Sequence, residues 1–153
     1  IMLNMKFENI NEVILSLILW ISSNTEHPKP INPINLNFIE QKELQDLACG
    51  RPCEIIAYTP MNKNNEIFLI NSLNPLQDVC AQGILLHEII HVIQQENEFA
   101  VEYEDNTKKH LREMNALVSH NLFLSHHGKK ILYSNGFAAK FKTGKNSKNN
   151  IYC

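Results

Sequence analysis

Apolar residues recur at three- and four-residue steps near the start of the chain, as they do on one face of an amphipathic helix. They are Ile10, Ile14, Leu17, Ile18 and Ile21. The pattern predicts a core helix that is capped by Asn9 or Asn11 and ends near Ser23. Three prolines within residues 27–33 remove amide donors and favour extended backbone, so we expect a surface connector after this helix.

Short runs rich in isoleucine and aromatic residues occupy the next part of the chain. A short helix at residues 40–48 is expected before them, ended by a glycine and a proline. Residues 54–59 and 66–70 contain the Ile, Tyr and Phe that are typical of strands. The polar residues 60–65 between them have the composition of a turn, so the two runs are predicted to form a β-hairpin.

Two long helical patterns follow the predicted hairpin. An Asn-Pro pair at residues 74–75 has the composition of a helix start, and the pattern continues to about Gln95. The middle of this helix is apolar nearly all round, which predicts that it is buried inside the domain. An acidic connector at residues 96–105 leads to Thr107, which is expected to cap a third long helix through about His126.

The composition is typical of one globular domain that covers residues 1–153. The chain is 44% hydrophobic and 20% charged, with a formal net charge of -2. This near-neutral balance gives no reason to expect a nucleic-acid partner. All 16 acidic residues lie at or before Glu113. We expect a core at about residues 10–127 and a basic, Asn/Lys-rich, partly disordered segment at residues 128–153.

The compartment and the assembly of the protein are only weakly indicated. The longest apolar run, residues 13–21, is about half the length of a membrane helix, so no membrane span is predicted. It also resembles a signal-peptide core, but Glu8 and Glu12 occupy positions where such a peptide carries positive charge. A cytoplasmic location is therefore slightly favoured over export. The four cysteines are compatible with either location, the pairing of Cys49 with Cys53 stays open, and the oligomeric state is not indicated.

An HExxH sequence lies inside the predicted buried helix and consists of His87, Glu88 and His91. Residues four apart share a helix face about 5–6 Å apart, so both imidazoles can bind one metal ion. Glu88 projects to one side, where its carboxylate can take a proton from a metal-activated water. The alternative is a pair of hydrogen-bonded core histidines with a paired glutamate. Only about 0.03 chance matches are expected at this composition, which favours the metal site.

A catalytic zinc ion needs a third protein ligand and one open position. The residues after His91 lack the glycine and third histidine that continue the motif in metzincins. The next helix offers His110, Glu113 and His120. Glu113 follows His91 by 22 residues and flanks the apolar stripe of its helix, so it is the preferred third ligand.

These motifs resemble those of gluzincin-type zincin metallopeptidases, whose third zinc ligand is a downstream glutamate in an ExxA-like stretch. Here that stretch is Glu113-Met114-Asn115-Ala116. Over residues 10–127 the chain also resembles a small uncharacterised bacterial family similar to the minigluzincins. Many gluzincins have an aspartate four residues after this glutamate, where it braces a zinc-binding histidine. Leu117 stands there in this chain, and His120 is a candidate hydrogen-bond donor to the transition state.

The resemblance implies an α+β, zincin-like fold of three main helices with a small sheet over the HExxH helix. It also implies that Zn²⁺ is bound by His87, His91 and Glu113, and that Glu88 is the general base in peptide-bond hydrolysis. An extended peptide or protein substrate would pair with an edge strand, for which residues 66–70 are the candidate. The alternative functions are hydrolysis of a non-peptide amide and a non-catalytic zinc-binding or interaction module. In that module the metal site is decayed, or closed by a fourth protein ligand such as Cys80.

Overall fold

The computed structural model describes residues 7–61, 64–134, 139–140, 142–143 and 151–153 of the chain. The helices of this part are α1 (Ile10–Asn24), α2 (Gln41–Ala48), α3 (Val79–Glu96) and α4 (Asp105–His126). The longer strands are β1 (Asn35–Ile39) and β3 (Glu66–Ile70). The two-residue strands are β2 (Ala57–Tyr58), β4 (Tyr133–Ser134), β5 (Ala139–Lys140), β6 (Lys142–Thr143) and β7 (Ile151–Tyr152). The fold is mixed, as an α+β class predicts.

Helix α1 follows the predicted apolar pattern. The Asn9 side chain accepts a hydrogen bond from the backbone N–H of Glu12 and thereby caps the helix, so the first of the two candidate caps is confirmed. The helix buries one face against the core, with Val13, Ile14, Leu17 and Ile21. Its C-terminal end is closed by Thr25, whose hydroxyl donates to the carbonyl of Ile21. The predicted helix at residues 40–48 is α2.

A three-stranded sheet has β3 at its centre, between β1 and β2. The predicted hairpin is confirmed where β2 and β3 pair antiparallel, with Ala57 opposite Leu69. Strand β1 was not predicted from the sequence. It pairs with β3 in parallel, from Asn35 opposite Glu66 onward. The expectation that residues 66–70 form an edge strand is therefore wrong. Because β1 occupies one side of β3 and β2 the other, the edges of this sheet are β1 and β2.

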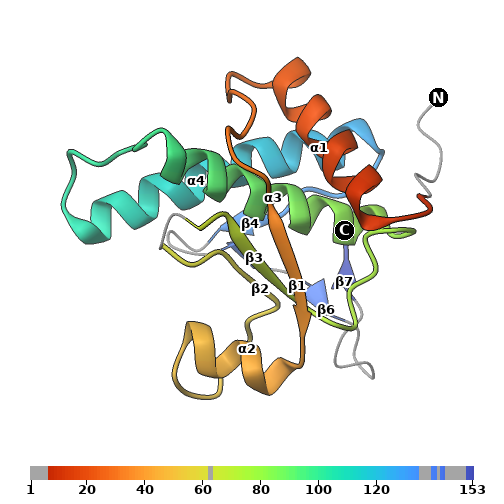
Figure 1. Cartoon of the computed structure of the whole chain (residues 1–153), viewed down its shortest axis with the longest axis horizontal. Helices are drawn as coiled ribbons and strands as arrows, with labels where there is room; N and C mark the ends of the chain where they lie inside the picture. The colour runs from red at the N-terminus through yellow and green to blue at the C-terminus, as the bar shows by residue number, and fades with distance from the viewer. Residues whose placement is uncertain (1–6, 62–63, 135–138, 141, 144–150) are drawn as a thin grey trace.

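Helix α3 forms the centre of the fold. Figure 1 shows it crossing the middle of the molecule, with α1 on one side and the three-stranded sheet on the other. Sixteen of its 18 residues are buried, as predicted from an apolar pattern nearly all round the helix. The start differs from the prediction, because Asp78 is the cap and the helix begins at Val79. Asn74 instead forms a tight turn, in which its side chain accepts from the N–H of Leu76.

Helix α4 packs along α3 and carries the second half of the candidate site. The sequence pattern predicted Thr107 as the N-terminal cap, but the cap is Glu104. The Glu104 carboxylate accepts hydrogen bonds from the backbone N–H groups of Asn106 and Thr107 and from the Thr107 hydroxyl. A glutamate at this position is an unusual cap, which explains the misplaced boundary. The helix ends at His126, as predicted.

Two disulfides join parts of the described chain. Cys49 is bonded to Cys53, beside the C-terminal end of α2, and Cys80 is bonded to Cys153. The second bond attaches the end of the chain to the first turn of α3. Much of the basic segment at residues 128–153, for which partial disorder was expected, lies outside the described residues. Among the described residues, no helix combines the length and apolar character needed to cross a bilayer.

Candidate metal centre

Three predicted ligands from two helices meet at one point. One ligand atom from each of His87, His91 and Glu113 lies within 4.8 Å of the other two. Glu113 bridges the histidines, since its Oε1 is 2.8 Å from Nε2 of His87 and its Oε2 is 3.2 Å from Nε2 of His91. This cluster of two imidazoles and a carboxylate could hold a metal ion, although it does not by itself identify the metal.

The packing of α4 against α3 produces this arrangement. His87 and His91 are one helical turn apart, with ring centroids 4.9 Å from each other. On α4, Ala116 and Leu117 are buried in the core and hold the helix against α3. Glu113 lies one turn before Leu117 on the same face, so its carboxylate reaches the two histidines. The side chains of His91 and Glu113 are each 18% exposed, which leaves the cluster open to solvent.

Glu88 lies beside this cluster and is not a member of it. Glu88 is only 8% exposed, and its Oε1 accepts a hydrogen bond of 2.8 Å from the hydroxyl of Thr59. Thr59 directly follows β2, so this bond connects the edge of the sheet to α3. Thr59 was not predicted from the sequence as a site residue. Its only local signal is a polar residue between a strand and the following proline.

Gln94 holds His91 from the other side of its ring. Its Oε1 is 2.8 Å from Nδ1 of His91, and its Nε2 donates to the carbonyl of Arg112 and to Oδ1 of Asn115. Because the amide nitrogen is occupied in this way, Nδ1 of His91 is the donor to Oε1, and Nε2 is the ring nitrogen that could bind a metal ion. Gln94 was not predicted from the sequence as a site residue either. A buried amide three residues after His91 in an apolar helix was the available signal.

The position of His120 differs from the one that a transition-state donor requires. It is 1% exposed and lies against His87, with the two Nδ1 atoms 3.1 Å apart. It does not line the cleft in front of the cluster. Two other candidate ligands are also placed elsewhere, because Cys80 is in a disulfide and His110 is outside the cluster.

The charges of the cluster strongly affect its ionisation. Burial disfavours the imidazolium form of His91, but hydrogen bonding to Glu113 and the charges of Glu88 and Glu113 outweigh it, and the pKa of His91 rises to about 9. Burial likewise opposes ionisation of Glu113, yet its contacts with the two histidines hold its pKa far below the ordinary value. The negative charge of Glu113 thus favours a proton on His91, and the same negative charge would attract a metal cation.

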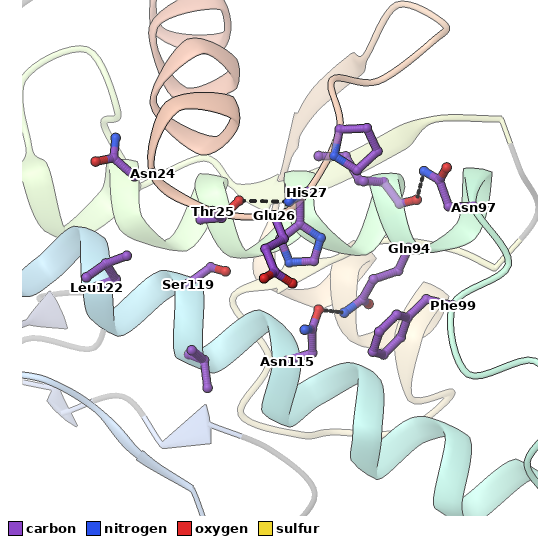
Figure 2. Close-up of a pocket in the computed structure, with 13 residues that line it drawn as sticks. Asn24, Thr25, Glu26, His27, Gln94, Asn97, Phe99, Asn115, Ser119 and Leu122 are labelled. Carbon is purple, nitrogen blue, oxygen red and sulfur yellow. Dashed lines mark hydrogen bonds between the residues drawn. The ribbon is translucent and has the colours of Figure 1, made fainter.

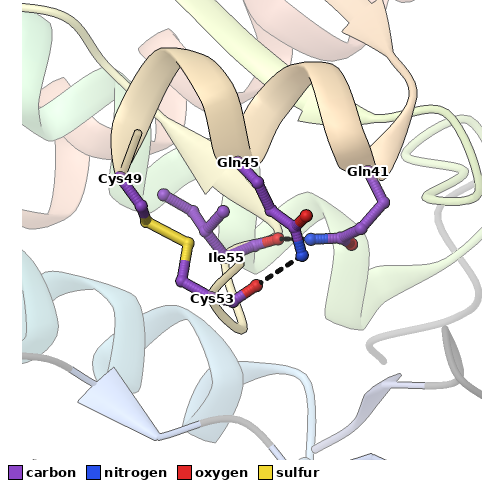
Figure 3. Close-up of a disulfide and its surroundings, with 5 residues drawn as sticks. All are labelled: Gln41, Gln45, Cys49, Cys53 and Ile55. Carbon is purple, nitrogen blue, oxygen red and sulfur yellow. Dashed lines mark hydrogen bonds between the residues drawn. A yellow bond between two sulfur atoms is a disulfide. The ribbon is translucent and has the colours of Figure 1, made fainter. Parts of the chain in front are cut away.

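A cleft of about 710 Å³ opens in front of the cluster. Strand β2 and the Cys49–Cys53 disulfide form one wall, and α4 contributes the charged residues Asp105, Lys108, Lys109, Arg112 and Glu113. Figure 3 shows how α2 supports the first wall. Gln45 donates to the carbonyl of Cys53, and Gln41 donates to the carbonyl of Ile55. The cleft is thus lined by an extended strand and by a face of α4 that carries both basic and acidic side chains.

A second pocket, of about 460 Å³, lies beside the other end of Gln94. Figure 2 shows Gln94 and Asn115 pointing toward each other there, near His27 and Ser119. Burial lowers the pKa of His27, although the charge of Glu26 opposes the shift. The pocket contains none of the residues predicted as ligands or as the general base.

Comparisons of the chain with protein-family models, with curated proteins and with solved structures find no match. The resemblance to gluzincins therefore stays a prediction from the two sequence motifs.

Proposed function

We propose that the protein is a zinc-dependent metallopeptidase of the gluzincin type. The observation that carries this proposal is the convergence of His87, His91 and Glu113 within 4.8 Å, at the bottom of a cleft. The same cleft is lined by Glu88, which is adjacent to the cluster and outside it. A cluster of potential ligands with a separate carboxylate beside it is the arrangement that metal-assisted hydrolysis requires.

The residues of the cluster fit zinc. Imidazole nitrogens and a carboxylate oxygen are ligands that Zn²⁺ accepts, and three protein ligands leave a fourth position for water or substrate. Gln94 supports the histidine donor by holding Nδ1 of His91, as partners of zinc-binding histidines commonly do. A bound zinc ion supplies Lewis acidity, which polarises a carbonyl group and makes a water molecule acidic.

Glu88 is the proposed general base. Its Oε1 accepts the hydrogen bond from Thr59, so the carboxylate is held in one orientation. The other carboxylate oxygen takes the proton of the attacking water and delivers it to the nitrogen of the leaving amine. Because Glu88 lies beside the metal-binding groups and lines the cleft, it can perform both transfers without leaving its position.

An extended peptide is the proposed substrate, paired with β2. This strand is at an edge of the sheet, and Ala57 and Tyr58 line the cleft. The backbone groups on the free side of an edge strand can form main-chain hydrogen bonds with an added strand. A peptide bound there would run along the cleft, past Glu88 and the cluster. This proposal replaces β3 by β2 as the strand that the substrate pairs with.

The test combines metal analysis with an assay of peptide cleavage. Protein purified without added metal is analysed by elemental mass spectrometry and then incubated with an unstructured protein whose fragments are identified by mass. We expect one zinc per chain and cleavage in the wild type, zinc without cleavage in Glu88→Gln, and loss or weakening of zinc binding in Glu113→Ala. Glu43→Ala, at an exposed acid on α2, is the control and should behave as wild type.

Each outcome separates the proposal from its alternatives. If Glu88→Gln retains full activity, Glu88 is not the base. Zinc without cleavage of any peptide or amide in the wild type would favour a non-catalytic metal-binding module. If the wild type binds no zinc even when zinc is offered, the metal centre itself is refuted.

The disulfides also bear on the compartment, and we propose an oxidising one. Such bonds persist in secreted and periplasmic proteins and are rare in reducing cytosol. Two of them, Cys49–Cys53 and Cys80–Cys153, join the described residues. They favour an exported protein over the cytoplasmic location that the sequence slightly favoured. Intact-mass measurement of the cellular protein under non-reducing conditions tests this, because four free thiols would contradict it.

A further inference from the structure

His120 contacts a metal-ligand histidine from inside the core. It lies on α4 seven residues after Glu113, so the two side chains are two turns apart on the same helix face. Glu113 contacts Nε2 of His87 from the front, with its Oε1 at 2.8 Å. His120 contacts the opposite side of the same ring, with its Nδ1 at 3.1 Å from Nδ1 of His87. Helix α4 therefore positions a polar group at each ring nitrogen of His87.

The chemistry of two facing nitrogens determines which one carries the hydrogen. A hydrogen bond between two Nδ1 atoms needs one protonated and one unprotonated nitrogen. If Nε2 of His87 binds a metal ion, that atom is unprotonated, and the neutral ring carries its hydrogen on Nδ1. His120 must then accept through an unprotonated Nδ1 and carry its own hydrogen on Nε2.

Helix α3 has a glycine, which carries no side chain, at the position next to the ring of His120. Gly83 lies one turn before His87 on α3, and a Cβ at this position would be only 2.9 Å from Nε2 of His120. It would also be 3.1 Å from Cδ2 of Leu124. Glycine destabilises a helix interior relative to alanine. Its presence in the second turn of α3 is explained by the space that the His120 ring needs.

We propose that His120 is a positioning residue that holds His87 in its metal-binding tautomer and orientation by accepting a hydrogen bond from Nδ1. This inference rests on the proposed metal centre and deepens it. In many of the gluzincins that the chain resembles, an aspartate braces a zinc-binding histidine from the position that Leu117 occupies in this chain. His120 takes over this bracing role here. At this place, where His120 is 1% exposed, a neutral acceptor costs less to bury than a carboxylate.

The first test is zinc affinity, measured by competition with a chromophoric chelator. His120→Phe keeps a ring and removes the acceptor, and it should weaken zinc binding about 10- to 100-fold. His120→Asn restores an acceptor oxygen near the position of Nδ1 and should recover most of the affinity. Gly83→Ala changes no polar group but displaces the ring of His120, so it should also weaken binding. Ser119→Ala, at a neighbouring buried position, is the control and should leave the affinity unchanged.

The second test does not depend on how the variants fold. Two-bond ¹H–¹⁵N correlation spectra of the zinc-loaded wild type report which nitrogen of each histidine carries hydrogen. We expect hydrogen on Nδ1 of His87 and on Nε2 of His120. Hydrogen on Nδ1 of His120 would overturn the proposal, and so would wild-type zinc affinity in a folded His120→Phe variant. A wild type that binds no zinc would instead refute the metal centre on which this inference rests.

Discussion

The hydroxyl of Thr59 donates a hydrogen bond of 2.8 Å to Oε1 of Glu88. Thr59 follows the edge strand β2, and Glu88 lies in the middle of the buried helix α3. Both residues are 8% exposed, so little water competes for this bond. It therefore links the strand proposed to bind substrate with the carboxylate proposed to act on it.

Replacing Thr59 by valine should lower kcat without changing the zinc content. The change keeps the shape of the side chain and removes the hydroxyl, so the Glu88 carboxylate loses the contact that orients it. A hydrogen bond to a charged group contributes about 1.5–3 kcal/mol, so we expect kcat to fall by about tenfold or more. Steady-state kinetics and elemental analysis measure the two quantities. Thr25→Val, which removes a hydroxyl at the end of α1, is the matched control. An unchanged kcat in Thr59→Val would contradict the inference that Thr59 orients Glu88 for catalysis.

Replacing Gln94 by leucine should weaken zinc binding and destabilise the fold. His91 would lose the partner of its Nδ1, and two acceptors, the carbonyl of Arg112 and Oδ1 of Asn115, would lose their donor. We expect about 10- to 100-fold weaker zinc binding and a loss of about 1–3 kcal/mol in the free energy of unfolding.

Gln95→Leu separates the two effects of that change. Gln95 is also a buried amide of α3, and it donates to the carbonyl of Pro60. The variant should be destabilised to a similar extent but bind zinc as the wild type does. If both variants lose zinc affinity equally, the weaker zinc binding of Gln94→Leu comes from the destabilised fold and not from the lost contact with His91.

Zinc affinity should rise with pH up to about pH 9. The pKa of His91 is about 9 in the metal-free protein, because contacts with Glu113 and Glu88 outweigh burial. Zinc must displace this proton, so the apparent affinity should increase about tenfold per pH unit below pH 9 and level off above it. Chelator competition at several pH values, together with proton release on binding, measures the dependence. An affinity that is constant between pH 7 and 8.5 would contradict it.

The stability of the metal-free protein should change in the opposite direction. The pKa of His91 is raised from its ordinary value of 6.5 to about 9 in the folded state. Its pairing therefore stabilises the fold fully below about pH 6.5, and this contribution is lost as the pH rises through about 9. Urea unfolding of chelator-treated protein between pH 6 and 9.5 should show the loss. Glu113→Gln, which removes the charged partner, should show a flatter profile; an equally steep one would assign the effect to another group.

The two disulfides should differ in their effect on stability. Cys80 and Cys153 are separated by 73 residues, so their bond closes a long loop, whereas Cys49 and Cys53 are four apart. By the chain-entropy relation, replacing the first pair with serine should cost about 4.5 kcal/mol, and replacing the second should cost about 2 kcal/mol. Urea unfolding of both double variants measures the difference. A larger loss for the short loop would contradict the expectation.

Several elements were predictable from the sequence because their signals are local. The apolar spacing of α1 and the all-round apolar pattern of α3 follow from helix geometry alone. The four-residue spacing of His87 and His91 likewise requires both rings to lie on one face as soon as the segment is helical. Glu113 was chosen from the helix pattern and from the resemblance to gluzincins, and the structure brings it to both histidines.

The features that were missed or misplaced depend on contacts between distant parts of the chain. Strand β1 forms because it pairs with β3, about 30 residues later, and this pairing places β3 at the centre and leaves β1 and β2 as the edges of the sheet. The turn at Asn74 and the cap at Glu104 were decided by side-chain hydrogen bonds that residue preferences only weakly favour.

The sequence by itself thus determined the helices and the pair of histidines, because each depends on residues within a few turns of one another. Only the tertiary structure decided what surrounds that pair. Thr59 reaches Glu88 from the sheet, Gln94 joins His91 to α4, and His120 lies behind His87. These contacts join side chains from different elements, and local spacing does not encode how those elements pack.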